Sequence, residues 1–196
     1  MVWVLWFTGL PGCGKTTIAG LVKELLRDKG IDVKILQLDE IRRIITPQPK
    51  YSEEERDLVY ASLAYMAKLL YEAGVNTIVD ATANKASYRQ LGRSLVANFG
   101  EVYFKAPLEV CIARESLRKA EFAPKDIYVK AIKERAPVPG VGISYEPPEN
   151  PEIEVDTSVL SARDSARFVV SELLDLFYGN ANPSRNSPNK ETFRIN

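Results

Sequence analysis

The stretch Gly9-Leu-Pro-Gly-Cys-Gly-Lys-Thr-Thr17 follows a short apolar run, Val2–Thr8, and precedes a segment with helical periodicity. It matches the pattern G-x-x-x-x-G-K-[ST], in which glycines let successive backbone N–H groups approach phosphate oxygens. The helix that follows such a loop directs its positive end at the same oxygens. The stretch therefore predicts a phosphate-binding loop between a buried strand and a helix.

The side chains of this loop have distinct expected roles. Lys15 would reach the β- and γ-phosphates of a nucleotide, and the Thr16 hydroxyl would ligate Mg²⁺. Backbone N–H groups would bind the remaining phosphate oxygens. We therefore expect the nucleotide-binding residues of the loop to be Gly9, Pro11, Gly12, Cys13, Gly14, Lys15, Thr16 and Thr17.

Strand-like and helix-like patterns alternate along the rest of the chain. Apolar runs of strand length are separated by helical patterns of about 10–15 residues or more, and this order indicates parallel βαβ units. The sequence therefore predicts an α/β fold, a three-layer α/β/α sandwich with a mostly parallel sheet, which is the P-loop NTPase fold. The expected strands are Val2–Thr8, Val33–Leu38, Val75–Val79, Glu101–Ala106 and Glu152–Val155.

Composition excludes several classes of protein. The chain has 196 residues, with 26 Lys and Arg against 26 Asp and Glu, no His and two Cys. Zero net charge offers no broad basic surface, and the apolar start is too short to span a bilayer, so we expect no nucleic-acid or membrane partner. The absence of His excludes a His-based catalytic site. Two Cys are too few for a disulfide framework and are typical of the reducing cytoplasm.

A single domain is expected over residues 1–178, because a chain of this length can bury one sizeable core. Residues 114–135 carry seven Lys and Arg against four Asp and Glu, and residues 136–151 contain five Pro and two Gly. The second of these segments predicts a shaped loop rather than a linker between domains. Residues 179–196 are rich in Asn, Ser and Pro and are expected to form a disordered tail.

The sequence lacks the motifs of a GTPase. The Asn-Lys pair at 84–85 is not completed to a guanine-reading N-K-x-D, and Asp80 is not followed three residues later by the glycine of a D-x-x-G switch. A compact chain with this phosphate loop and Arg residues after the second and third strands is typical of a kinase for a small acceptor. Such ligands meet at the carboxyl ends of the strands.

Several stretches resemble the adenylylsulfate kinase (APS kinase) family, whose members phosphorylate the ribose 3′-hydroxyl of adenosine 5′-phosphosulfate with MgATP. The most specific of them is Tyr145-Glu-Pro-Pro-Glu-Asn-Pro-Glu-Ile-Glu-Val-Asp-Thr157. The resemblance runs from Val4 to Thr157 and leaves out the tail. The other matching stretches are Gly9–Ala19, Leu38–Arg42, Tyr51–Arg56 and Tyr128–Ala131.

This resemblance implies an enzyme, a phosphotransferase with an alcohol acceptor that makes 3′-phosphoadenosine 5′-phosphosulfate in sulfate assimilation. It implies ATP and Mg²⁺ as cofactors, adenosine 5′-phosphosulfate as the small-molecule partner, a cytoplasmic location and a homodimer. In the family, the region matching residues 114–135 is a lid over the polyphosphate. Residues 136–151 correspond to a loop on the acceptor side.

The resemblance also assigns roles to residues after the phosphate loop. Asp39 would be catalytic together with Lys15, because it would accept the proton of the acceptor hydroxyl or hold Mg²⁺ through water. Its ordinary alternative is a helix N-cap. Arg42 and Arg56 would grip the phosphosulfate group, since a guanidinium fork suits an oxyanion. Their alternative is a solvated helix face.

Four further residues each have a functional interpretation and an ordinary structural alternative. Asp80 ends a strand and would ligate Mg²⁺ with Thr16, or would merely cap a turn. Tyr51 would stack on the acceptor's adenine, or would be an ordinary partly buried aromatic. Arg114 at the nucleotide and Lys125 at the substrate would neutralise charge from the lid; otherwise this region is a solvated helix pair.

The sequence departs from the family pattern on the acceptor side. Gln37 stands in place of an Asp, Val59 in place of an Asn, Ala83 in place of a Ser, and Val138 in place of an aromatic residue. A run of residues is also inserted before Lys125. These changes leave open a kinase for another small hydroxyl metabolite, such as a sugar, an inositol or a nucleoside. A nucleotide-dependent binding protein without catalysis is a further alternative, which the joint presence of Lys15 and Asp39 disfavours.

Overall fold

The computed structural model describes residues 1–117 and 126–179. Within these residues the strands are β1 (Val4–Thr8), β2 (Val33–Gln37), β3 (Asn76–Asp80), β4 (Phe99–Lys105) and β5 (Ile153–Asp156). The helices are α1 (Lys15–Arg27), α2 (Leu38–Ile45), α3 (Glu53–Glu72), α4 (Ala86–Leu95), α5 (Leu108–Ser116), α6 (Ile127–Glu134) and α7 (Ala162–Tyr178). Lys125 and the expected tail from residue 180 onward lie outside the described residues.

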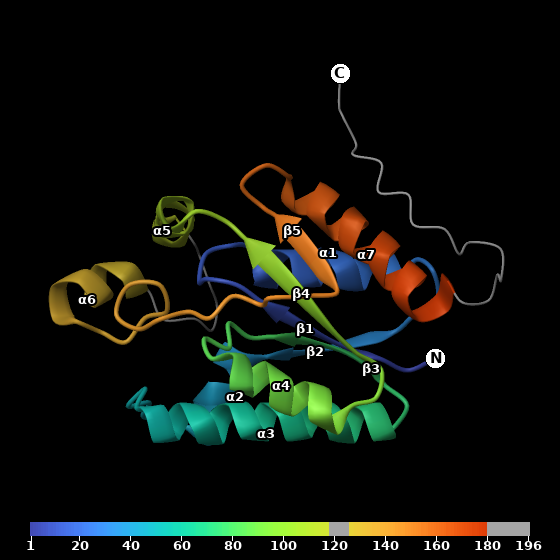
Figure 1. Cartoon of the computed structure of the whole chain (residues 1–196), viewed down its shortest axis with the longest axis horizontal. Coiled ribbons are helices and arrows are strands. Elements are labelled where there is room, and N and C mark those ends of the chain that lie inside the picture. Colours follow the sequence, from blue (N-terminus) through green and yellow to red (C-terminus); the bar gives the residue numbers. More distant parts are fainter. Residues whose placement is uncertain (118–125, 180–196) are drawn as a thin grey trace.

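The described strands form one sheet in the order β2-β3-β1-β4-β5, and each neighbouring pair is parallel. Helices α1 and α7 cover one face of this sheet, and α3 and α4 cover the other (Figure 1). The prediction of a three-layer α/β/α sandwich is confirmed, and its sheet is parallel throughout the described strands.

The central strand β1 shows why the apolar run at the start of the chain has no polar face. Leu5 and Phe7 pack in the cluster under α1 and α7, whereas Val4 and Trp6 pack in the cluster under α3 and α4. All four side chains are fully buried. A strand covered by helices on both faces is apolar at every position, which is the pattern that the sequence carries.

The boundary between α4 and β4 differs from the expectation. The helical pattern in the sequence extends over about residues 87–98, but the helix ends at Leu95, and the strand begins at Phe99, two residues before the expected start. Val96 adopts an extended conformation and is buried against the cluster under α4. Burial of Val96 and Phe99 in that cluster therefore overrides the local helical pattern.

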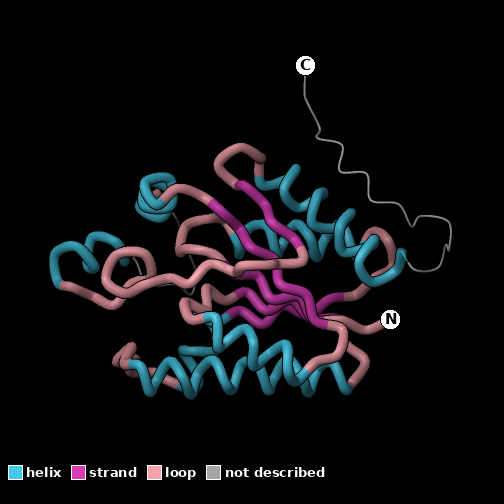
Figure 2. The backbone as a smooth tube through the Cα atoms, viewed as in Figure 1, coloured by secondary structure: helices cyan, strands magenta, loops and turns pink. Residues whose placement is uncertain are grey.

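The carboxyl ends of three strands bring the expected site residues to one edge of the sheet. The phosphate loop follows β1, Asp39 follows β2, and Asp80 is the last residue of β3. In the sheet register Asp80 lies beside both Phe7 of β1 and Gln37 of β2. Loops that follow the strands gather at the end of the sheet away from the N-terminus (Figure 2), and α5 and α6 lie at the same end.

Candidate active site

At two glycines of the phosphate loop, a backbone at positive φ is combined with close contact to the backbone of another element. Gly12 has φ 84°, and a Cβ there would lie 2.3 Å from the carbonyl oxygen of Cys111. Gly9 has φ 144°, and a Cβ there would lie 2.4 Å from the carbonyl oxygen of Phe104. Any larger residue would push the loop away from α5 or β4. These glycines therefore hold the loop closely against the rest of the domain.

Lys15 is buried at the first position of α1 and turns back over its own loop. Its Nζ donates to the carbonyl oxygens of Gly9 at 2.9 Å and Leu10 at 3.0 Å. These bonds hold the ammonium group at the edge of the loop, beside the amino end of α1. A cation and a helix amino end in one place form a site for a polyphosphate.

Two residues from distant parts of the chain support this loop. The Tyr128 hydroxyl of α6 donates to the carbonyl oxygen of Pro11 at 2.8 Å, and the Thr157 hydroxyl donates to the carbonyl oxygen of Cys13 at 2.8 Å. Both supporting side chains are buried. Arg114 of α5 joins the second contact, since it donates to Thr157 Oγ1 at 3.2 Å and to the Thr157 carbonyl oxygen at 2.7 Å.

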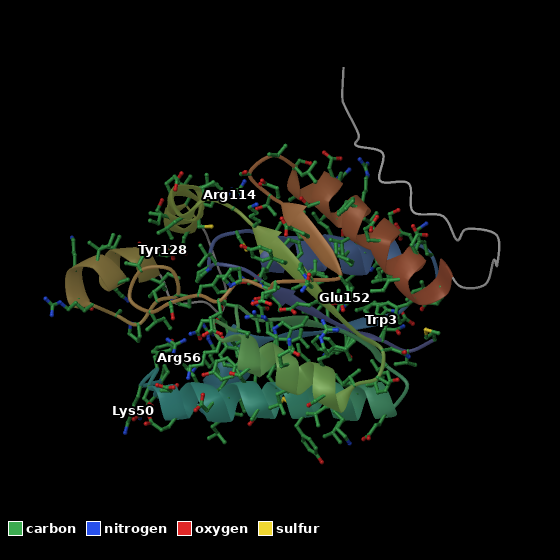
Figure 3. The ribbon with its side chains drawn as sticks, in the orientation of Figure 1. Trp3, Lys50, Arg56, Arg114, Tyr128 and Glu152 are labelled. Carbon is green, nitrogen blue, oxygen red and sulfur yellow. The ribbon has the colours of Figure 1, made fainter. Side chains whose placement is uncertain are left out.

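One cleft of about 670 Å³ brings nearly all of the expected site residues together. Gly9 does not line this cleft, although its carbonyl oxygen holds Lys15. Arg56 of α3, Arg114 of α5 and Tyr128 of α6 lie at the same end of the molecule (Figure 3). The expected site residues that line the cleft are Pro11, Gly12, Cys13, Gly14, Lys15, Thr16, Thr17, Asp39, Arg42, Tyr51, Arg56, Asp80 and Arg114.

Two carboxylates that line the cleft, together with the Thr16 hydroxyl, are candidate ligands of Mg²⁺. Asp39 is the second residue of α2, whose N-cap is Gln37, so the alternative of an N-cap role for Asp39 is wrong. Asp80 is buried at the end of β3. With the Thr16 hydroxyl, they offer the oxygen ligands that Mg²⁺ prefers. In the described part of the chain, no group of three or more His, Cys, Asp or Glu could hold a metal ion, so Mg²⁺ would depend on phosphate oxygens and water as well.

Arg42, Tyr51 and Arg56 form a compact cluster that also lines the cleft. The guanidinium carbons of Arg42 and Arg56 lie 5.0 Å and 5.9 Å from the centre of the Tyr51 ring. Arg56 donates from Nε to the Tyr51 carbonyl oxygen at 3.2 Å and from Nη2 to the Pro137 carbonyl oxygen at 2.5 Å. Both arginines are buried, so the alternative of a solvated helix face is wrong for both.

Burial shifts the pKa values of Arg56 and Tyr51 in opposite directions. Burial lowers the pKa of Arg56, and the positive charge of Arg42 lowers it further. Burial also raises the pKa of the Tyr51 hydroxyl, which stays protonated at neutral pH. The cluster therefore presents two close cations and a neutral aromatic ring, a combination that favours a ligand with both an oxyanion and a planar ring.

The four departures from the family pattern fall in two environments. Gln37 and Val138 line the cleft. Val59 and Ala83 are fully buried in the apolar cluster under α3 and α4. Val59 does not line the cleft and its side chain offers no polar contact, so the expected loss of a contact to the acceptor at this position stays a prediction.

The Tyr145–Thr157 stretch is the most specific part of the family resemblance, but the sequence alone assigned no role to it. The structure shows which contacts hold this stretch in place. Arg89 of α4 is buried, pairs with Glu101 and donates from Nη2 to the Glu146 carbonyl oxygen at 2.7 Å. The Glu146 carboxylate accepts from the backbone N–H of Ala86 at 2.6 Å. These bonds fasten the Pro-rich loop to α4. Sequence reasoning missed Arg89 because one arginine in a helix gives no signal of burial.

Comparison with known proteins agrees with this geometry. The family model described as adenylylsulphate kinase matches residues 1–156. The chain belongs to the adenylylsulphate kinase family. A probable adenylyl-sulfate kinase of Pyrococcus abyssi is 38% identical over 175 residues, which cover 89% of this chain and 96% of the relative. An adenylyl-sulfate kinase of Halothermothrix orenii is 35% identical over 177 residues, covering 90% and 91%.

A solved structure of this family has the same fold. The Mycobacterium tuberculosis APS kinase in complex with AMPPNP and APS superimposes with a TM-score of 0.78 at 30% identity, covering 88% of this chain and 97% of that one. Among the helices of the described residues, none is long and apolar enough to cross a membrane. By family and by fold, the chain is a phosphotransferase of the P-loop kinase type.

Proposed function

We propose that this protein transfers the γ-phosphoryl group of ATP to the 3′-hydroxyl of adenosine 5′-phosphosulfate. One observation carries the proposal: the phosphate loop and the Arg42, Tyr51 and Arg56 cluster line the same cleft. A phosphate donor and an anionic acceptor with an aromatic base would therefore meet in one place. The M. tuberculosis kinase, which contains AMPPNP and APS in its structure, supports the same pairing of ligands.

On the donor side, the chain's own residues position the polyphosphate and stabilise its charge. The backbone of residues 9–17 binds phosphate oxygens, and Lys15 exchanges its contacts with Gly9 and Leu10 for the β- and γ-phosphates. Thr16, Asp80 and, through water, Asp39 are the residues that would hold Mg²⁺, which supplies charge neutralisation when bound. Arg114, held on Thr157, neutralises charge from the side of α5.

At the junction of the two halves, Asp39 orients the acceptor hydroxyl and takes its proton. Its position at the start of α2 places a half-buried carboxylate on the cleft wall, next to the strand that carries Asp80. Positioning of the two reactants and charge stabilisation are the main sources of rate in phosphoryl transfer.

On the acceptor side, Arg42 and Arg56 bind the phosphosulfate group and Tyr51 contacts the adenine. Val138 lines the cleft where the family has an aromatic residue, so the base stacks on one ring instead of two. This change weakens binding of the adenine but leaves binding of the phosphosulfate group intact. We therefore expect selectivity among acceptors to depend mainly on their anionic group.

The remaining parts of the proposal concern the whole protein. Residues 1–178 form one kinase domain, in which 114–135 act as a lid and 136–151 border the acceptor. The protein works in the cytoplasm as a homodimer, with a small-molecule acceptor and without a nucleic-acid partner. Analytical ultracentrifugation of the purified chain tests the dimer, since a monomer mass would contradict it.

The acceptor is tested by ADP release from MgATP with adenosine 5′-phosphosulfate and with a panel of sugars, inositols and nucleosides. We expect adenosine 5′-phosphosulfate to give the highest kcat/KM, because no neutral alcohol engages both buried arginines. Lys15→Ala protein is the control for contaminating kinases. A higher kcat/KM for a neutral alcohol would contradict the proposal and would assign the cleft to another hydroxyl metabolite.

A further inference from the structure

Glu55 makes contacts that differ from those of an ordinary capping box. Ser52 is the N-cap of α3, and its hydroxyl accepts from the Glu55 N–H at 3.3 Å. In the usual box, the carboxylate of the third helical residue turns back to the N–H of the N-cap residue. Here Glu55 Oε2 reaches further and accepts from the backbone N–H groups of Lys50 at 2.6 Å and Tyr51 at 3.3 Å.

The second oxygen of the same carboxylate holds an arginine. Glu55 Oε1 accepts from Arg42 Nη1 at 2.7 Å, and the two side chains are only 13% and 7% exposed. A largely buried ion pair with a short hydrogen bond fixes the position of the guanidinium much more firmly than a surface pair would. Glu55 thus joins α2 to the segment that precedes α3.

Tyr51 needs such support because its backbone is in an unfavourable conformation. Its φ of 55° lies in the left-handed region, which a residue with a bulky side chain rarely adopts without surrounding contacts. The Tyr51 N–H is held by Glu55, and its carbonyl oxygen accepts from Arg56 Nε. This backbone conformation places the ring beside the guanidinium groups of Arg42 and Arg56.

We infer that Glu55 is the positioning residue of the acceptor half of the cleft. It does not line the cleft, and it acts through Arg42 and Tyr51, which do. The Glu55 carboxylate partly neutralises the positive charge of Arg42. Arg56 donates instead to two neutral carbonyl oxygens, so its positive charge attracts an anionic ligand more strongly. The inference rests on the proposed function, because it takes the ligand of Arg42, Tyr51 and Arg56 to be the acceptor.

Steady-state kinetics of Glu55→Gln test this role, with Glu54→Gln as the matched control. Glu54 is the neighbouring residue of the same helix turn and is exposed. For Glu55→Gln we expect the acceptor KM to rise about tenfold while the ATP KM changes by less than about twofold. An unchanged or lower acceptor KM, or an equal rise of both KM values, would overturn the inference, because a general loss of structure does not single out one substrate.

A double-mutant cycle with Arg42→Gln tests whether Glu55 acts through Arg42. If it does, the acceptor KM of the double variant rises clearly less than the product of the two single effects, because the part of the Glu55 effect that passes through Arg42 is already lost. Multiplication of the two single effects would show that Glu55 and Arg42 act independently and would contradict the inference.

A measurement without any acceptor separates this inference from the proposed function. Hydrogen exchange followed by NMR should show slow exchange of the Lys50 and Tyr51 amides in the wild-type protein and at least about tenfold faster exchange in Glu55→Ala, with the amides of β1 unaffected. Equal rates at Lys50 and Tyr51 in the two proteins would overturn the inference. If the wild-type protein fails to phosphorylate adenosine 5′-phosphosulfate, the proposed function fails, while these exchange rates still decide the role of Glu55.

Discussion

The two halves of the cleft are built in different ways. The donor half is centred on one continuous loop, whose geometry comes from glycines at positive φ and from the backbone between Gly9 and Thr17, with Asp80 and Arg114 added from β3 and α5. The acceptor half is assembled from side chains of α2, α3 and the Pro-rich loop, with Arg42, Tyr51 and Arg56 at its centre. A backbone site depends on few residue types at fixed spacing, whereas a side-chain site depends on packing between separate segments.

Because of this difference, acceptor contacts can change without any change in the phosphate loop. The departures at Gln37 and Val138 both line the cleft, and neither lies in the phosphate loop. The comparison therefore predicts separable kinetics: changes in the loop should act on turnover or nucleotide binding, and changes in the Arg42–Tyr51–Arg56 cluster should act on acceptor binding.

Lys15→Ala should have the largest effect. Removal of the cation that meets the transferring phosphoryl group should lower kcat about a thousandfold. Acceptor binding, measured by calorimetry, should stay within about twofold of the wild-type value, because Lys15 belongs to the donor half. A large loss of acceptor affinity in this variant would break the separation of the two halves.

Asp39→Asn should lower kcat about a hundredfold, because it removes the group that orients the acceptor hydroxyl and takes its proton. The affinity for nucleotide should change little, as measured by titration with an ATP analogue. A variant with near-normal kcat would show that Asp39 neither accepts the proton nor acts at the metal.

Arg56→Ala should act chiefly on the acceptor. Loss of a hydrogen bond from a charged group costs about 1.5–3 kcal/mol, which corresponds to a rise in acceptor KM of about 10- to 100-fold. The ATP KM should be unaffected. Arg163→Ala, on the exposed face of α7, is the control for general loss of positive charge. If the ATP KM rises as much as the acceptor KM, Arg56 does not belong to a separate acceptor half.

Thr157→Val should have the smallest effect of the series and act on the donor half. Valine keeps the shape of the side chain but removes the hydroxyl that bonds the Cys13 carbonyl oxygen and Arg114. One such neutral hydrogen bond is worth about 1 kcal/mol, so nucleotide affinity should fall about fivefold. Thr157→Ser, which retains the hydroxyl, should bind nucleotide normally; a loss in Thr157→Ser equal to that in Thr157→Val would remove the hydroxyl from the explanation.

The order of strands and helices could be predicted from the sequence, because the spacing of apolar residues and the position of turn residues are local signals. The end of α4 could not, because the burial of Val96 and Phe99 against another layer decides it. The same limit applies to the site. The phosphate loop can be recognised from nine consecutive residues, Gly9 to Thr17.

Contacts between segments that are far apart in the sequence gave no comparable local signal. Arg56 and Pro137 are 81 positions apart, and Thr157 and Cys13 are 144 positions apart. Ser52 and Glu55 have the spacing of a capping box, which is typical of a helix start, but this spacing could not reveal that the Glu55 carboxylate holds Arg42 of α2. The family resemblance pointed to Arg42 and Arg56, and only the fold shows what fixes them in place.

The position of the transferred phosphate tests the central claim most directly. The wild-type protein is incubated with MgATP and adenosine 5′-phosphosulfate, and the nucleotide product is analysed by ³¹P NMR and mass spectrometry. The account predicts one new phosphate on the ribose 3′-hydroxyl and an equal amount of ADP. ADP formed without a phosphorylated acceptor, or a phosphate on any other atom of the acceptor, would contradict it.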